Sequence, residues 1–288
     1  MLRVIRPYSA YQHELDEAIV RGLERHGEEL ERLEITAQDL IDSTDVLRRQ
    51  RDELHAVPYM SGQPFQRRQA PVGEVTGYEA LPPVFAGGSA YAGFEDVFRG
   101  PAVRVTELQR PYLELVASHQ PVVDVGCGRG EFLALLTSQG ITARGVDSDP
   151  GMVERCRTQG FEVEHADALA YLEGTADGTV GSVFCAQFIE HLSADALSAF
   201  LELTRRKLRP GGLLIAETVN PHSVPALKTF WVDPTHRHPI FPETALALCA
   251  LAGFTSAYVF APGHSAFEKA KFTATAYAVV ATAPTSAP

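Results

Sequence analysis

The residues best suited to chemistry lie in one short stretch, from Pro121 to Leu133, with the sequence P-V-V-D-V-G-C-G-R-G-E-F-L. The apolar run before the glycines predicts a short buried strand, and the run after them predicts the start of a helix. Gly126, Gly128 and Gly130 form the turn between the two. Glycine has no Cβ and tolerates positive φ, so the backbone of such a turn can pass close to a ligand. The stretch therefore predicts a ligand-binding loop, with a glycine-rich turn that binds nothing as the alternative.

The spacing of the loop, with Asp124 two residues before its first glycine, narrows the choice of ligand. A pyrophosphate-binding loop has the spacing G-x-G-x-x-G, and a carboxylate would repel the phosphates. A carboxylate suits a ligand with a cationic end, such as S-adenosylmethionine (SAM), whose ammonium and sulfonium groups are positive. The string Asp124-x-Gly126-x-Gly128-x-Gly130 resembles the first motif of class I SAM-dependent methyltransferases.

Further acidic residues follow the next two predicted strands. Asp147 comes after the second strand, and ligands bind at the carboxyl ends of the strands in an open α/β sheet. A carboxylate there can accept hydrogen bonds from both hydroxyls of a ribose. Asp149 is better explained as the N-cap of the next helix. The resemblance implies that Asp167 bonds the adenine amino group and that Met152 faces the adenine, with core packing as the alternative for Met152.

The resemblance implies a cofactor site drawn from the glycine loop and from the ends of the following strands. Its predicted residues are Asp124, Gly126, Cys127, Gly128, Gly130, Asp147, Ser148, Met152, Asp167, Ala168 and Gln187. SAM would be the methyl donor and S-adenosylhomocysteine the product. The resemblance also makes Tyr91, Phe94 and Arg99 candidates for contact with the ligand, with core packing as the alternative for the two aromatic residues.

The order of predicted elements indicates an α/β fold. The resemblance extends over about residues 91–281 and implies a Rossmann-like, seven-stranded sheet with helices on both faces and an antiparallel last strand. We predict three parts in the chain. They are an amphipathic, coiled-coil helix at 1–56, a linker rich in proline and glycine at 57–90, and a methyltransferase domain at 91–288.

Leucine recurs every seven residues in the first part of the chain. One row has Leu33, Leu40, Leu47 and Leu54, and a second row has Leu23, Leu30 and Ala37. Two such rows form the a/d seam of a coiled coil. The seam predicts a homodimer joined through this helix. A single amphipathic helix packed on its own catalytic domain is the alternative.

Glu190 and His191 follow the predicted fourth strand, close to where the transferred methyl group should lie. Methyl transfer to a hydroxyl needs a general base, and histidine titrates in a suitable range. We therefore predict that His191 is the base and that Glu190 orients it, with capping of the next helix as the alternative. One carboxylate and one imidazole also suit a divalent cation, so these two residues are the candidate ligands for Mg²⁺. A magnesium site usually has more oxygen ligands than this pair offers.

The stretch from Glu217 to Pro242 is too long for a simple connection and contains aromatic and polar residues among prolines. Such residues suit a carbohydrate, because a ring can stack on the sugar and polar groups can bond its hydroxyls. The strings E-T-x-N-P and D-P-T-H-x-x-P resemble bacterial glycan methyltransferases. These include O-antigen chain-terminating and mycobacterial methylmannose polysaccharide 1-O-methyltransferases. The resemblance implies methylation of a sugar hydroxyl on a mannose-containing oligosaccharide, with Asp233 and His236 as further catalytic candidates. An exposed loop without this role is the alternative.

Composition limits the partners and the compartment. The net charge of −11 argues against nucleic acid or an anionic membrane as the main partner. The four cysteines are scattered, which indicates reduced thiols. No apolar run reaches the length of roughly 18 residues that spans a bilayer. We therefore expect a cytoplasmic protein.

Two other functions remain open at this level. The same Glu190–His191 pair would serve an O-methyltransferase of a quinone-like or other small metabolite. A SAM-binding coiled-coil scaffold without catalysis is the third hypothesis. The polar D-P-T-H stretch favours a sugar over an apolar ring.

Overall fold

The computed structural model describes residues 2–55, 66–77, 93–94, 98–99, 102–264 and 267–285. Tyr91 and most of the predicted linker lie outside the described residues. The chain divides into two compact units, Met1–His55 and Ala56–Pro288, which are described separately below. Among the described residues, no helix combines the length and the apolar character needed to cross a bilayer.

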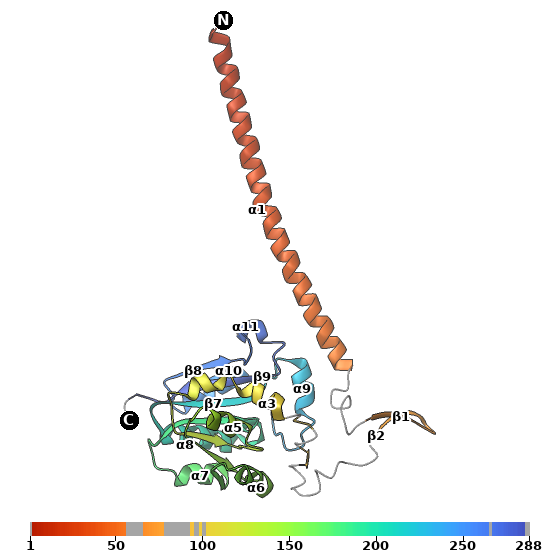
Figure 1. Cartoon of the computed structure of the whole chain (residues 1–288). Helices are drawn as coiled ribbons and strands as arrows, with labels where there is room; N and C mark the ends of the chain where they lie inside the picture. The colour runs from red at the N-terminus through yellow and green to blue at the C-terminus, as the bar shows by residue number, and fades with distance from the viewer. Residues whose placement is uncertain are drawn as a thin grey trace. The chain divides into compact units, whose positions relative to one another are not determined.

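The first unit is a single helix, α1 (Leu2–His55), drawn in Figure 1 as one continuous rod. It spans nearly the whole of the predicted helix at 1–56. Leu23, Leu30, Leu33, Leu40 and Leu47 of the two leucine rows are each 60–66% exposed. The apolar seam therefore faces solvent in the single chain, and its pairing with a second copy stays a prediction.

The predicted linker contains a regular element. Strands β1 (Gln66–Ala70) and β2 (Gly73–Gly77) pair antiparallel, with Ala70 opposite Gly73. Proline and glycine account for the hairpin, because Pro71 occupies the two-residue turn and Gly73 takes a φ of 112°. Regular structure within this linker was not predicted from the sequence.

The second unit contains a seven-stranded sheet with the order β5-β4-β3-β6-β7-β9-β8. Its strands are β3 (Val122–Val125), β4 (Ala143–Asp147), β5 (Val163–His165), β6 (Val180–Ala186), β7 (Leu208–Val219), β8 (Ser256–Phe260) and β9 (Ala276–Thr282). Pairing is parallel from β5 to β7, and β9 runs antiparallel to β7 and β8. The predicted fold class and the antiparallel last strand are confirmed. The order reverses between β3 and β6, which places a ligand crevice at their carboxyl ends.

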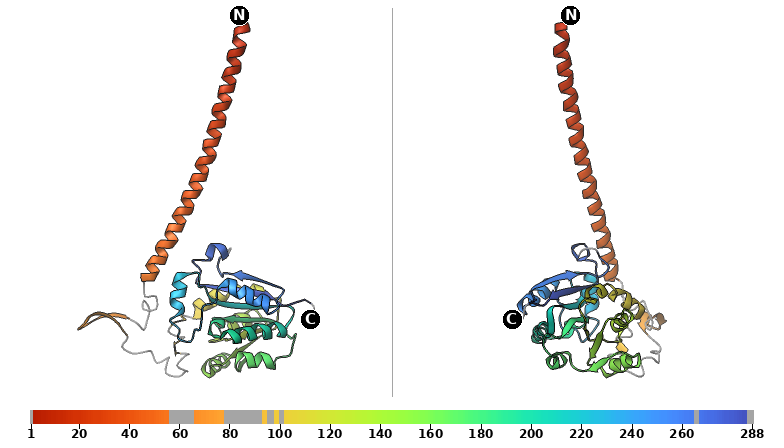
Figure 2. Two further views of the ribbon diagram at one scale, coloured as in Figure 1. Left: turned by 180° about the vertical axis from the view of Figure 1, so that it is seen from behind. Right: turned by 60° about the vertical axis from the view of Figure 1, so that its left-hand side comes forward.

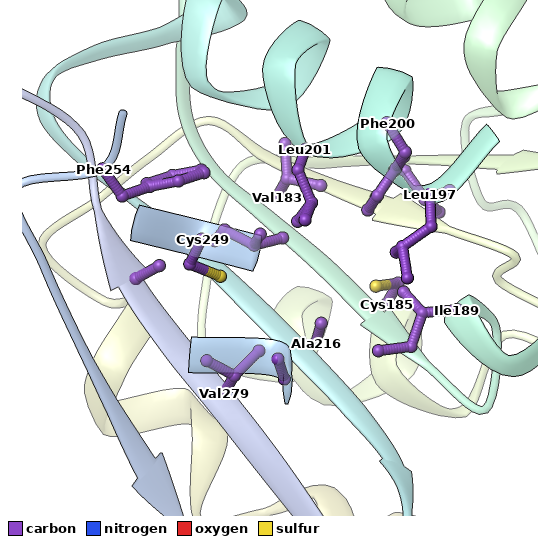
Figure 3. Close-up of a cluster of buried hydrophobic side chains, with 14 of the residues drawn as sticks. Val183, Cys185, Ile189, Leu197, Phe200, Leu201, Ala216, Cys249, Phe254 and Val279 are labelled. Carbon is purple, nitrogen blue, oxygen red and sulfur yellow. The ribbon is translucent and has the colours of Figure 1, made fainter. Parts of the chain in front are cut away.

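Helices cover both faces of the sheet (Figure 2). They are α3 (Ala102–Gln109), α4 (Tyr112–Val116), α5 (Glu131–Ser138), α6 (Pro150–Thr158), α7 (Ala168–Gly174), α8 (Ala194–Lys207), α9 (Val224–Phe230), α10 (Pro242–Leu251) and α11 (Phe267–Ala270), with the 3-10 helix η3 (Ile189–His191). Side chains of α7, α8 and α10 form one core with the sheet, and those of α4 and α5 form another. Figure 3 shows part of the first core, where Phe200 and Leu201 of α8 meet Val183 of β6.

Local sequence explains most element boundaries. Asp149 caps α6, as predicted, by accepting hydrogen bonds from Gly151 N and Met152 N. Ser193 caps α8 by accepting one from Ala196 N. Every residue of β3 and β6 is buried, as expected for strands covered on both faces. Residues 209–212, whose proline and glycines favour a turn, belong instead to the start of β7, where the pairing with β6 shifts register.

Gly145 in β4 links the packing of the sheet to the glycine loop. A Cβ on Gly145 would lie 2.8 Å from Cys127 Sγ and 2.8 Å from Leu133 Cδ1. We expect Gly145→Ala to lower the free energy of unfolding by about 1–3 kcal/mol, because overpacking forces neighbours to shift. Urea unfolding measures this. The control is Gly174→Ala, whose Cβ would meet nothing within 4 Å, and equal unfolding free energies for the two variants would contradict the packing account.

Candidate active site

A cleft of about 300 Å³ lies at the carboxyl ends of the parallel strands. It is lined by Arg99, Gly126, Gly128, Val146, Asp147, Ser148, Asp149, Met152, Ala166, Asp167, Ala168, Leu169, Gln187, Phe188, His191, Leu192 and Thr235. Apart from Arg99, which precedes the sheet, the lining residues come from the carboxyl ends of four parallel strands and the segments after them, and from one later loop. The cleft is therefore at the position that the strand order predicts for a ligand.

The glycine loop forms one wall of the cleft and cannot carry side chains there. Gly126 and Gly128 have φ values of 67° and 52°. A Cβ on Gly126 would lie 3.1 Å from the Phe188 ring, and one on Gly128 would lie 3.0 Å from a guanidinium nitrogen of Arg99. Both the backbone conformation and the space therefore require glycine at these two positions.

Asp147 joins the ends of β3 and β4. Its Oδ2 accepts a hydrogen bond from Gly128 N at 2.8 Å, and its Oδ1 accepts one from Asp149 N at 2.8 Å. Burial raises the pKa of Asp147, while these two hydrogen bonds oppose the rise. The carboxylate thus fixes the glycine loop and still lines the cleft, where it can bond a ribose.

Asp124 lies behind this wall. It is 3% exposed and does not line the cleft. Burial raises the pKa of Asp124 to about 8, although the Arg99 guanidinium acts to lower it. The group is therefore mostly protonated at neutral pH in the ligand-free chain. A cation in the cleft would favour its ionised form.

The other predicted cofactor residues divide into two groups. Ser148, Met152, Ala168 and Gln187 line the cleft, as does Asp167, whose Oδ1 also caps α7 at Leu169 N. Cys127 and Gly130 do not line it. The Cys127 thiol is buried in a small core with Val153 and Cys156, and Gly130 gives room to Cys156 and Phe161.

Of the three residues before β3 that were predicted to contact the ligand, Phe94 and Arg99 lie within the described part of the chain. Arg99 lines the cleft beside the glycine loop. Phe94 packs against Phe98, with ring centroids 4.5 Å apart, and does not line the cleft. Arg99 and Gln187 also line a neighbouring cleft of about 330 Å³, whose wall includes Glu217.

His191 lines the cleft from η3. Its neighbour Ile189 is buried beneath α8 and anchors this short helix in the core (Figure 3). The His191 Nδ1 atom lies 2.9 Å from Thr235 Oγ1, and that hydroxyl donates to Asp233 Oδ1 at 2.6 Å. Burial, followed by the nearby His236 ring, lowers the pKa of His191. The imidazole is therefore neutral at pH 7.

Glu190 points into the protein interior. Its exposed fraction is 0%, so its carboxyl group is shielded from solvent. Burial raises the pKa of Glu190 to about 8, so this group is mostly protonated at neutral pH. The structure thus places Asp233 and His236 beside His191, whereas Glu190 is not a member of that cluster.

The stretch from Glu217 to Pro242 contains helix α9, so only parts of it are irregular. Buried Asn220 donates to the carbonyls of Lys271 and Ala274 and so holds the chain in place. Thr235 reaches the cleft from this stretch, which sequence reasoning missed although Asp233 and His236 on either side were singled out. The signal was present, since Thr235 belongs to the D-P-T-H string.

Sequence reasoning also missed that two side chains hold Glu217 in place by hydrogen bonds. The Tyr112 hydroxyl donates to Glu217 Oε2 at 2.5 Å, and Gln187 Nε2 donates to Oε1 at 3.4 Å. Gln187 has a φ of 54°, the one positive value outside glycine among the described residues. Such strain is common at functional sites. Gln187 stands between the two clefts, where its side chain can contact ligands in both.

Comparison with known proteins agrees with this geometry. Residues 123–216 match the family model described as "Methyltransferase domain". A SAM-dependent methyltransferase from Archaeoglobus fulgidus superposes with a TM-score of 0.61 at 29% identity, over 67% of this chain and 100% of that one. The fold is that of class I SAM-dependent methyltransferases, and SAM is the implied cofactor.

Curated relatives match only part of the chain. A ubiquinone biosynthesis O-methyltransferase of Paraburkholderia xenovorans is 32% identical over 107 residues, which cover 34% of this chain and 44% of the relative. A 2-ketoarginine methyltransferase of Streptomyces arginensis is 34% identical over 113 residues, 37% of this chain and 34% of the relative. The chain thus spans about half or less of the length of these relatives.

The raised pKa of Asp124 predicts a proton linkage. In the ligand-free chain the pKa of Asp124 is about 8, so the carboxyl group carries a proton at neutral pH. We expect SAM binding to release this proton, because the cationic ligand favours the ionised carboxylate. Affinity should therefore rise from pH 6 to pH 7.5. Calorimetry in two buffers of different ionisation enthalpy measures the release. Asp124→Asn should abolish it, and equal proton release by this variant would contradict the assignment.

Proposed function

We propose that this methyltransferase transfers the methyl group of SAM to a hydroxyl oxygen of a sugar. The observation that carries the proposal is the position of His191, which lines the same cleft as Gly126, Gly128 and Asp147. A nitrogen that can accept a proton therefore faces the cofactor cleft. This arrangement supports an oxygen nucleophile, which must lose a proton as it is methylated.

SAM, when bound, supplies a methyl group on a positively charged sulfur that is itself the leaving group. The chain must align the acceptor oxygen behind that methyl group and take up its proton. His191 is neutral at pH 7 because burial lowers its pKa, so it can accept this proton. Thr235 holds the imidazole through Nδ1. Phe188 and Leu192, which also line the cleft, help to exclude water.

Features of the stretch after β7 support a sugar acceptor. Trp231 is 60% exposed, and Phe230 packs edge-on against it with ring centroids 5.0 Å apart. An exposed and supported ring is suited to stacking on a sugar. The glycan resemblance of this stretch implies a mannose-containing oligosaccharide or polysaccharide precursor as the acceptor.

A second candidate function follows from the relatives. Those from Paraburkholderia xenovorans and Xylella fastidiosa are named ubiquinone biosynthesis O-methyltransferases. Their names favour a hydroxyl of a quinone-like metabolite as the acceptor. His191 would serve this reaction equally well, so the acceptor distinguishes the two functions.

An acceptor panel tests the choice. We expect transfer of labelled methyl from SAM to manno-oligosaccharides, and no transfer to catechols or quinols of similar size. Transfer to free but not to blocked reducing ends would assign the anomeric hydroxyl as the target. Transfer to catechols alone would contradict the sugar proposal and support the second candidate. Bound SAM without transfer to any hydroxyl would support a scaffold.

The role of His191 predicts a selective loss of turnover. We expect His191→Ala to lower kcat by about 10²–10⁴-fold, the usual contribution of a general base. Affinity for S-adenosylhomocysteine should change little, because the glycine loop and Asp147 remain. Steady-state kinetics and calorimetry measure the two effects. His119→Ala, outside the cleft, is the control, and full turnover by His191→Ala would contradict the role.

We propose that α1 pairs with the α1 of a second copy. Its leucine rows are exposed in the single chain, and pairing would bury them. The double substitution of Leu40→Asp and Leu47→Asp should therefore produce monomers in sedimentation velocity. Asp39→Ala with Asp42→Ala, which alters acidic residues of the same helix, should leave the dimer intact. A monomeric wild-type protein would contradict the proposal.

A further inference from the structure

Three metal-ligating side chains converge on one side of the cleft. One ring nitrogen of His191, one of His236 and one carboxylate oxygen of Asp233 all lie within 4.8 Å of one another. The Asp233 and His236 side chains are only 15% and 10% exposed. We infer that these three residues bind a divalent transition-metal ion.

His236 is oriented as metal-binding histidines usually are. Its Nδ1 lies 2.7 Å from the Phe230 carbonyl oxygen, which can only accept, so Nδ1 carries a hydrogen. Its Nε2 lies 3.8 Å from Asp233 Oδ2. The ring also packs on Phe230 with centroids 4.4 Å apart. A carbonyl that fixes the tautomer and the ring orientation is the usual second partner of a metal-bound histidine.

Asp233 is also held in position. Its Oδ1 accepts from Thr235 N at 2.7 Å and from Thr235 Oγ1 at 2.6 Å. Its Oδ2 is the oxygen that faces His236. The same Thr235 hydroxyl lies 2.9 Å from His191 Nδ1, so one side chain connects two of the three ligands. The His191 and His236 rings lie edge to face, with centroids 4.6 Å apart.

The ligand types indicate which metals the site would take. Two imidazoles and one carboxylate suit Zn²⁺, Co²⁺, Fe²⁺ or Ni²⁺, whereas Mg²⁺ prefers oxygen ligands. Metal bonds of about 2.1 Å at tetrahedral angles place ligand atoms about 3.4 Å apart. Side-chain rotations that bring the ligand atoms closer together by up to about 1.4 Å would produce that geometry. This assignment replaces the predicted Mg²⁺ site on Glu190 and His191.

The open coordination positions of such an ion would face the cleft, because His191 and Thr235 line it. There the ion would bind a hydroxyl oxygen of the acceptor and lower its pKa. With the ion bound, His191 would be a ligand rather than the proton acceptor, so the O–H bond would break with its proton passing to water. The oxygen would then form its bond to the methyl group as the sulfur–methyl bond breaks. This role rests on the proposed methyl transfer, whereas the binding of the ion does not.

The binding test uses the full chain, freed of metal with a chelator and then titrated with Co²⁺. We expect one equivalent to bind, with visible absorption bands that Zn²⁺ abolishes. Asp233→Asn and His236→Gln should each weaken Co²⁺ binding at least tenfold. His238→Gln, in the same stretch but outside the cluster, should bind Co²⁺ like the wild type. Unfolding temperatures without metal and the affinity for S-adenosylhomocysteine check that the variants are folded.

The result that overturns the site is the absence of stoichiometric Co²⁺ uptake by the wild type. Equal uptake by the wild type, Asp233→Asn and His236→Gln would overturn it as well. Methyl transfer by chelated protein without Co²⁺ uptake would leave the proposed function intact and remove the metal. Co²⁺ uptake without transfer to any hydroxyl would uphold the site and contradict the proposed function. Activity lost with the chelator and restored by Co²⁺ or Zn²⁺ would support both.

Discussion

The cleft depends on one carboxylate that connects the ends of two strands. Asp147 accepts hydrogen bonds from Gly128 N after β3 and from Asp149 N after β4. The loop needs this support because its three glycines adopt positive φ and have no side chains that could pack. The parallel pairing of β3 with β4 brings the two strand ends together. The shape of the cofactor wall thus follows from the register of the sheet and from one acidic side chain.

Buried carboxyl groups set the electrostatics around this wall. Burial raises the pKa of Asp124, of Glu190 and of Glu217. Arg99 acts in the opposite direction on Asp124 and Glu217, because its guanidinium lies beside the glycine loop. A buried acid is costly to ionise unless a positive charge is near. The ligand-free chain therefore favours the binding of a cationic ligand. SAM is positively charged at both its ammonium and its sulfonium group.

The sequence predicted the parts that depend on local chemistry. Asp149 was recognised as a helix cap because a side-chain oxygen must satisfy free N–H groups there. The strand end at Asp147 was recognised because an apolar run stops at that point. The hairpin of β1 and β2 was missed, although Pro71 and Gly73 are the residue types that such a turn uses.

The contacts between distant residues could not be predicted. His191 and Thr235 meet across 44 positions, which requires the path of the chain through α9. Spacing alone could not show that the Cys127 thiol would turn away from the cleft into the core, because a loop pattern specifies the backbone and not each side chain. The burial of Glu190 was equally hidden, since a carboxylate beside a histidine is usually expected at a surface.

The most direct test of the central claim is a crystal structure of the full chain with S-adenosylhomocysteine. The account predicts that the ribose hydroxyls bond Asp147 and that the ligand amino group lies on the Asp124 side of the glycine loop. The sulfur should then face the part of the cleft that His191 and Thr235 line. A ligand bound outside this cleft, or one whose sulfur is turned away from His191, would contradict the account.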